Sequence, residues 1–129
     1  MLTALAIIVS EGKVLIGKVK TELLPEYGGL EYVFPCTQPK NEENTTDALM
    51  REVALQCGIR VSIAEKIGER VHPVTNNLTE YYRCERSEDE AVKASPESDM
   101  EQYIWVEVQD IAKYMPSLFE QIVEHLEIN

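Results

Sequence analysis

Apolar residues recur with two different periods along the chain and so divide it into strands and helices. Two apolar, β-rich runs at residues 2–9 and 13–20 are separated by a polar, glycine-containing turn, which predicts a hairpin. A short strand is predicted at residues 31–34, where Pro35 stops it. Residues 36–44 are polar and show no period, so we expect a loop there.

The next segment has the period of an amphipathic helix. Asn44 is expected to cap its N-terminus, with Asp47 three residues later as an approximate capping box. Gly58 is expected to end the helix, because glycine adopts the left-handed conformation of that position readily. The predicted apolar stripe consists of Ala48, Leu49 and Val53.

The second half of the chain continues with short apolar runs and one long polar segment. The predicted elements are strands at residues 59–64, 67–71, 78–84 and 103–106, a turn at residues 76–77 and a short helix at residues 108–113. Residues 87–101 are acidic and contain a proline, so they are expected to form a mobile loop. Leu118, Ile122 and Leu126 mark an amphipathic terminal helix, which we expect to pack on the sheet rather than to bind a partner.

This order of strands and helices predicts a layered α/β or α+β fold in one domain over residues 1–129. The first apolar run is too short to span a membrane and has the features of a buried strand rather than of a targeting segment. The formal net charge of −11 disfavours broad binding to DNA or RNA. A small phosphate-bearing ligand is compatible with this charge, because a few local cations or one metal ion suffice to attract it.

Cysteine and histidine usage argues against structural disulfides and zinc. The three cysteines are an odd number without a close pair, as expected for a cytoplasmic protein in a reducing environment. No Cys-x-x-Cys motif occurs, and His72 and His125 are isolated, so a structural zinc site is not expected.

The segment that carries candidate chemistry extends from the predicted loop through the predicted helix. It resembles the Nudix box, G-x5-E-x7-R-E-U-x-E-E-x-G-U, in which U is a bulky aliphatic residue. The positions that match are Glu43, Arg51, Glu52, Val53, Gly58 and Ile59. Three positions depart from the box: Thr37 stands at its glycine, and Leu55 and Gln56 stand at its paired glutamates.

The resemblance extends beyond the box to nearly the whole chain. Residues 34–35 precede the loop as in the family, with Tyr32 at the position of the family's tryptophan. Residues 14–18 resemble the family's second strand, and residues 105–106 resemble its last strand. The resemblance implies a MutT-like α/β/α sandwich with a mixed central sheet, a loop–helix–loop motif and a C-terminal helix.

In the Nudix family this motif holds magnesium or manganese against a diphosphate. Positions 52, 55 and 56 share one helix face, because they are three and four residues apart. Glu52 is the only carboxylate there, Leu55 has no oxygen ligand and is expected to pack in the core, and Gln56 has an uncharged carbonyl. We therefore expect weaker metal binding than in the family, with Glu97 and Asp99 of the acidic loop as further candidate ligands.

The resemblance also assigns roles to the retained residues. Glu43 and Arg51 would tie the loop to the helix through a charge-assisted hydrogen bond, and together with Glu52 they are the candidate catalytic set. Thr37 and Cys36 replace two glycines, so the loop path is expected to differ from that of the family.

Two further candidate sites lie outside the box. Lys18 and Lys20 are two residues apart on one strand face and are candidates for binding a ligand phosphate, with a solvated face as the alternative. Tyr32 leads directly into the loop and is a candidate for stacking on a base, with packing in the sheet as the alternative.

These features leave three functional hypotheses. The first is a Nudix-like protein that binds a nucleotide or a nucleoside-diphosphate-linked compound, with pyrophosphohydrolase activity weak or lost. The second is an active hydrolase of such compounds that depends on magnesium or manganese. The third is an interaction module without a ligand, in which the sheet and the terminal helix form a homodimer or partner surface.

Overall fold

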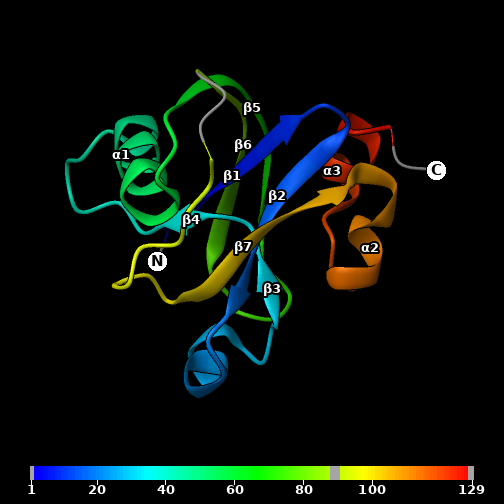
Figure 1. Cartoon of the computed structure of the whole chain (residues 1–129), viewed down its shortest axis with the longest axis horizontal. Coiled ribbons are helices and arrows are strands. Elements are labelled where there is room, and N and C mark those ends of the chain that lie inside the picture. Colours follow the sequence, from blue (N-terminus) through cyan, green and yellow to red (C-terminus); the bar gives the residue numbers. More distant parts are fainter. Residues whose placement is uncertain (1, 88–90, 128–129) are drawn as a thin grey trace.

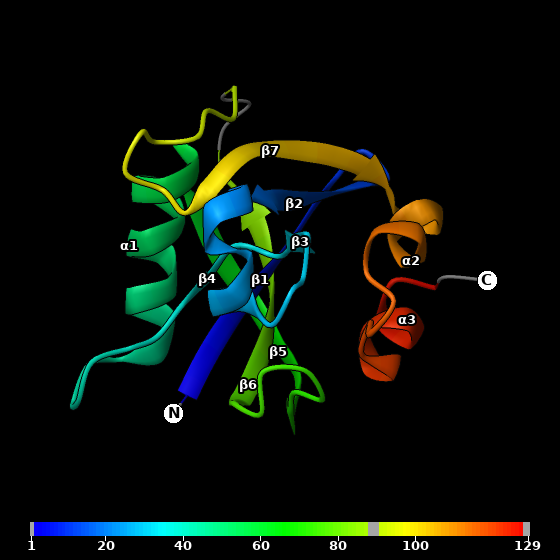
Figure 2. The same cartoon turned by 90° about the horizontal axis from the view of Figure 1, so that it is seen from below.

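Helices lie on both sides of a central sheet in the computed structural model, which describes residues 2–87 and 91–127 (Figures 1 and 2). Helix α1 (Thr45–Cys57) covers one side of the sheet. The short helices α2 (Ile111–Tyr114) and α3 (Glu120–His125) cover the other side. This arrangement is the predicted α/β/α sandwich.

Within the described residues, seven strands form one mixed sheet. Their bounds are β1 (Leu2–Ser10), β2 (Lys13–Val19), β3 (Tyr32–Val33), β4 (Cys36–Thr37), β5 (Val61–Val71), β6 (Leu78–Arg86) and β7 (Met100–Glu107). The order is β3-β2-β1-β6-β5, with β4 paired to β1 and β7 paired to β2. β1 and β6 run parallel, and the other pairs are antiparallel. The sheet is therefore centred on β1, which has neighbours on both edges.

The two residues predicted to cap α1, Asn44 and Gly58, do so in the structure. The side chain of Asn44 accepts a hydrogen bond from the backbone N–H of Asp47 at 3.0 Å, as an N-cap does. Gly58 follows the helix in the left-handed conformation, with φ 72°. The predicted stripe is buried and packs on the sheet, so the position and orientation of α1 are confirmed.

At three places the strands that form in the sheet differ from the strands and loops predicted from the sequence. β5 is one strand rather than two, because two register shifts keep it paired with β6 across the predicted break. Cys36 and Thr37, in the predicted loop, pair with β1 as β4. β7 begins at Met100, so the end of the predicted acidic loop belongs to the sheet. Residues 88–90 of that loop lie outside the described residues.

Two 3-10 helices lie in the connections between strands and helices. The first, η1 (Thr21–Tyr27), forms where no element is predicted, and it ends at Gly28 with φ 63°. The second, η2 (Val108–Asp110), leads directly into α2, so the short helix predicted at residues 108–113 consists of two pieces.

Apolar clusters on each side of the sheet hold the helices in place. Leu49 and Val53 of α1 belong to one cluster, and Ile111 and Ile122 belong to the other. α3 has only six residues, too few for a stable isolated helix, so the burial of Ile122 holds it against the sheet. The predicted packing of the terminal helix is thus confirmed.

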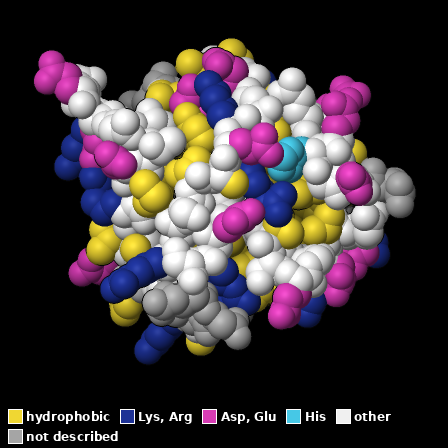
Figure 3. All heavy atoms as spheres, turned by 90° about the horizontal axis from the view of Figure 1, so that it is seen from above, with side chains coloured by type: hydrophobic (Ala, Val, Ile, Leu, Met, Phe, Trp, Pro, Cys, Tyr) yellow, Lys and Arg dark blue, Asp and Glu magenta, His cyan; other side chains and the backbone are white. Residues whose placement is uncertain are grey.

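Two features of the described residues concern long apolar helices and the distribution of basic side chains. Among the described residues, no helix is long and apolar enough to cross a membrane. On the face shown in Figure 3, acidic and apolar side chains separate the lysines and arginines, so they form no continuous stripe across it.

Candidate functional site

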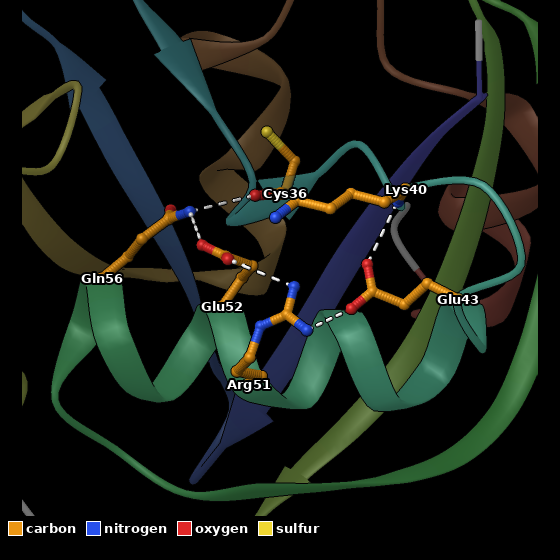
Figure 4. Close-up of polar contacts among 6 residues, drawn as sticks. All are labelled: Cys36, Lys40, Glu43, Arg51, Glu52 and Gln56. Carbon is orange, nitrogen blue, oxygen red and sulfur yellow. Dashed lines mark hydrogen bonds and ion pairs between the residues drawn. The ribbon is translucent and has the colours of Figure 1, made fainter.

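Glu43 ties the loop before α1 to the helix (Figure 4). Its carboxylate accepts a hydrogen bond from the backbone N–H of Lys40 at 3.1 Å and forms an ion pair with Arg51. Arg51 also lies 3.5 Å from the carboxylate of Glu52. The hydrogen bond with Arg51 holds the pKa of Glu43 below its ordinary value, and the same bond raises the pKa of Arg51. The contact expected between Glu43 and Arg51 is therefore present.

Gln56 joins three elements on the face of α1 that includes Glu52. Its Nε2 donates to the backbone carbonyl of Cys36 at 3.3 Å and to the Glu52 carboxylate at 3.2 Å (Figure 4). Its Oε1 accepts a hydrogen bond from the hydroxyl of Tyr103 on β7 at 3.1 Å. Because two acceptors face Nε2, the amide is fixed in this orientation. The only oxygen of the Gln56 side chain is thus engaged by β7.

Two adjoining pockets lie beside this network. The larger has a volume of about 400 Å³, and the smaller has a volume of about 280 Å³. Residues that line both are Tyr27, Phe34, Cys36, Gln56 and Asp99. Glu52, Leu55 and Glu97 line only the smaller one. The larger volume falls within the range of sites for small molecules.

Known structures share this arrangement of strands and helices. A Nudix hydrolase from Nitrosomonas europaea is 18% identical over 98% of this chain and 69% of its own, with a TM-score of 0.75. A MutT protein from Methanosarcina mazei is 19% identical over 98% of this chain and 92% of its own, with a TM-score of 0.76. An ADP-ribose pyrophosphatase from Streptococcus suis is 17% identical over 98% of this chain and 89% of its own, with a TM-score of 0.70.

The chain has the Nudix fold. No family model matches the sequence, and no curated protein matches it. At identities of 17–19%, the structural likeness establishes the fold alone, so the chemistry has to be argued from the site.

In this Nudix fold, the side chains of the site are not arranged to hold a magnesium or manganese ion. The carbonyl of Gln56 accepts from Tyr103, and Glu52 is hydrogen-bonded to Gln56. The carboxylate of Asp99 accepts a hydrogen bond from the hydroxyl of Tyr27 at 2.7 Å. Within residues 2–87 and 91–127, no three His, Cys, Asp or Glu side chains lie close enough together to hold a metal ion. A hard divalent cation needs several oxygen ligands directed at one point, and the described side chains of this site are not grouped in that way.

The expectation that Leu55 packs in the core is wrong. Its side chain is 62% exposed, and it lines the smaller pocket. Leu55 is two residues beyond the buried Val53, a rotation of about 200° around the helix, so it faces away from the sheet. The position of the first paired glutamate of the box is therefore an apolar wall of the pocket.

Tyr32 and Cys36 line the larger pocket. The ring of Tyr32 packs edge-on against Tyr114, with 5.0 Å between ring centroids, so one side of the ring already has a packing partner. Burial raises the pKa of the Cys36 thiol to about 11, which keeps it protonated near neutral pH. Cys36 is therefore a poor nucleophile in this state.

Lys18 and Lys20 lie outside the two pockets. The ammonium of Lys18 is 3.6 Å from the carboxylate of Glu101 on β7. The ammonium of Lys20 donates to the backbone carbonyl of Pro96 at 3.4 Å. Lys18 therefore connects β2 to β7, and Lys20, the residue after β2, connects to the segment before β7.

Sequence reasoning missed a set of polar residues in the larger pocket. These residues, which line only that pocket, include Thr3, Arg70, His72 and Thr79. The available signal was the spacing of Arg70, near the end of the strand, and His72, directly after it, since residues two apart in extended chain point to the same side. Which face they share with the other strands depends on sheet register, which local patterns do not specify.

Proposed function

We propose that the protein binds a nucleotide, or a nucleoside diphosphate linked to another group, in the two adjoining pockets, with pyrophosphate cleavage weak or lost. The observation that carries this proposal is the hydrogen bonding of Gln56, which occupies a position where the Nudix box has a glutamate. The likeness to an ADP-ribose pyrophosphatase supports the class of ligand. The larger pocket supports binding, because it is lined by the rings of Tyr32, Tyr81 and Phe119.

Weak or absent cleavage follows from the lack of an arranged metal site. In metal-assisted hydrolysis the ion neutralises charge on the phosphates and activates a water molecule. Here one carboxylate, Glu52, remains on the helix face, and its neighbours Leu55 and Gln56 provide no further negative charge. Binding without turnover is the behaviour that this set of side chains supports best.

The test is a calorimetric titration of ADP-ribose and of ADP into the purified protein, first in EDTA and then with magnesium or manganese. Product is assayed in the same samples. Binding in EDTA without product in either condition supports the proposal. Failure of both compounds to bind would reject it, and so would efficient cleavage that depends on the metal.

An active hydrolase is the second candidate, favoured by one specific observation. Glu52, Glu97 and Asp99 line the same pocket of about 280 Å³, and a bound diphosphate adds oxygen ligands of its own. This candidate predicts metal-dependent product formation that Glu52→Gln abolishes. Glu101→Gln is the matched control, because Glu101 is exposed and lines neither pocket. Turnover that survives Glu52→Gln would reject this candidate.

A further inference from the structure

Charge is distributed unevenly between the two pockets. The smaller pocket is lined by Glu52, Glu97 and Asp99, and no lysine or arginine of the described chain lines it. The larger pocket is lined by the carboxylates of Glu26 and Asp99 and by a single arginine, Arg70. Without a metal ion, a phosphate group in the smaller pocket would meet three carboxylates and no cation. Coulomb repulsion therefore disfavours that position for the anionic part of a ligand.

Arg70 keeps a positive charge at the wall of the larger pocket. Its Nε donates to the hydroxyl of Tyr81 at 3.0 Å, and its Nη2 donates to the backbone carbonyl of Ser117 at 2.6 Å. Its guanidinium also lies 4.8 Å from the ring centroid of Phe119. All of these partners are neutral, and within the described part of the chain Arg70 forms no ion pair. A guanidinium held in this way is oriented but not neutralised, so it attracts an anion.

Arg70 belongs to a polar row that crosses three strands. The strand register places Arg70 of β5 opposite Thr79 of β6, and Thr79 opposite Thr3 of β1. All three residues line the larger pocket and not the smaller one. Guanidinium and hydroxyl groups are the side-chain donors that commonly bind phosphate oxygens. The hydroxyl of Thr79 already donates to the backbone carbonyl of Asn77 at 3.0 Å, so the donors that this wall offers to a ligand come from Arg70 and Thr3, on either side of Thr79.

His72, two residues after Arg70, adds a donor to the same pocket. Burial, and then the charge of Arg70, lower the pKa of His72, so its ring is neutral near neutral pH. Its Nδ1 accepts hydrogen bonds from two backbone N–H groups of the following turn, at 3.1 and 3.4 Å. The ring proton therefore resides on Nε2, and His72 lines the larger pocket as a hydrogen-bond donor.

We infer that a phosphate group of the ligand binds to Arg70 and Thr3 of this row in the larger pocket, away from Glu52 and the loop–helix segment. The nucleotide nature of the ligand rests on the proposed function. In this position the phosphate lies in the pocket that Glu52 and Glu97 do not line. The same placement explains how a nucleotide would bind without a metal and remain uncleaved.

The experiment compares AMP with adenosine, titrated calorimetrically in EDTA. The native protein is expected to bind AMP more tightly, and Arg70→Gln is expected to weaken AMP binding about tenfold or more while changing adenosine binding little. Arg60→Gln is the matched control, because Arg60 is exposed and lines neither pocket, and the substitution removes the same charge. Equal binding of AMP and adenosine, or equal effects of the two substitutions, would overturn the inference.

Arg70→Gln also removes contacts with Tyr81 and Phe119, so a second variant guards against a simple loss of folding. Thr3→Val preserves side-chain volume and removes one hydroxyl of the row. It is expected to weaken AMP binding severalfold while thermal unfolding stays close to that of the native protein. Unchanged AMP binding by Thr3→Val, with AMP binding also kept by Arg70→Gln, would place the phosphate elsewhere.

Inorganic pyrophosphate separates this inference from the proposed function. If pyrophosphate binds and requires Arg70 while AMP, ADP and ADP-ribose do not bind, the phosphate site stands and the nucleotide proposal fails. If adenosine and AMP bind equally well, the nucleoside part of the proposal stands and the phosphate site fails. If no compound binds, both are rejected.

Discussion

At the residue scale, the amide of Gln56 makes three hydrogen bonds that a carboxylate could not all make. It donates to the carbonyl of Cys36 and to the carboxylate of Glu52, and an ionised glutamate has no donor for either. A glutamate there would bring two carboxylates together unless a cation lay between them. The side chain that removes a metal ligand therefore also stabilises the site in the absence of metal.

Gln56→Glu is expected to lower the free energy of unfolding by about 1–3 kcal/mol in EDTA, because acceptors lose their donor and two carboxylates face each other. Magnesium is expected to restore part of this loss. Urea denaturation with and without magnesium measures both effects. Leu55→Glu is the matched control, since Leu55 is 62% exposed, and it should change stability by less than about 0.5 kcal/mol. Equal losses in the two variants would show that the Gln56 network does not hold the site.

At the scale of elements, the ion pair of Glu43 and Arg51 connects the loop to α1. Arg51 lowers the pKa of Glu43 from its ordinary value of 4.5. The pair therefore stabilises the fold fully above the ordinary pKa, and this contribution is lost as the pH falls through the lower pKa of the folded state. The loop should accordingly loosen in acid although α1 keeps its N-cap.

Glu43→Gln is expected to lower the Tm near neutral pH, because the bond from Arg51 loses its ionised acceptor and the ion pair is lost. The difference from the native protein should shrink and disappear as the pH falls below 4.5. Thermal unfolding across this pH range measures it. Glu42→Gln is the control, because the neighbouring Glu42 is exposed and its substitution should have little effect at any pH. A difference for Glu43→Gln that persists in acid would contradict this assignment.

The contact between β2 and β7 leaves no room for a side chain at Gly17. A Cβ at this position would lie 2.7 Å from Met100 and 2.8 Å from the ring of Tyr103. Gly17→Ala is therefore expected to destabilise the protein by about 1–3 kcal/mol, as overpacking does. It should also displace Tyr103, whose hydroxyl bonds Gln56. Chemical denaturation measures the first effect and tyrosine fluorescence the second. Native-like stability would show that β7 moves aside without cost.

At the scale of the whole molecule, the sequence predicted the parts of the fold that depend on neighbouring residues. The ends and the apolar face of α1 are examples. Asn44 and Gly58 stand at the two ends of α1 and are recognisable because capping involves only residues a few positions apart. The apolar stripe of α1 was equally recognisable from its period. The resemblance of the box then located the loop, the helix and the Glu43–Arg51 contact.

The rest depended on how distant segments meet. The bond between Gln56 and Tyr103 spans 47 positions, and no local pattern marks Tyr103 as its partner. The row of Arg70, Thr79 and Thr3 exists only because β5, β6 and β1 pair in one register, with β1 and β6 parallel. A shift of one residue would turn each side chain to the opposite face. The polar wall of the larger pocket could therefore not be predicted from the order of residues alone.

The same scale governs how the protein responds to salt. With 23 acidic and 12 basic side chains, repulsion within the folded state is strong at low ionic strength. Raising the salt concentration from about 0.01 M to about 0.15 M shortens the screening length from about 30 Å to about 8 Å, so distant carboxylates cease to repel each other. Exposed ion pairs, such as that of Lys66 with Glu69, weaken too, but each contributes at most about 1 kcal/mol.

We therefore expect the Tm to rise by a few degrees over this range of sodium chloride, measured by calorimetry in EDTA. Potassium chloride should act alike, because screening depends on ionic strength rather than on the identity of the cation. Magnesium chloride at matched ionic strength is the informative comparison. An additional rise with magnesium would indicate a bound ion and favour the hydrolase, whereas a fall of the Tm with every salt would mean that ion pairs outweigh the repulsion.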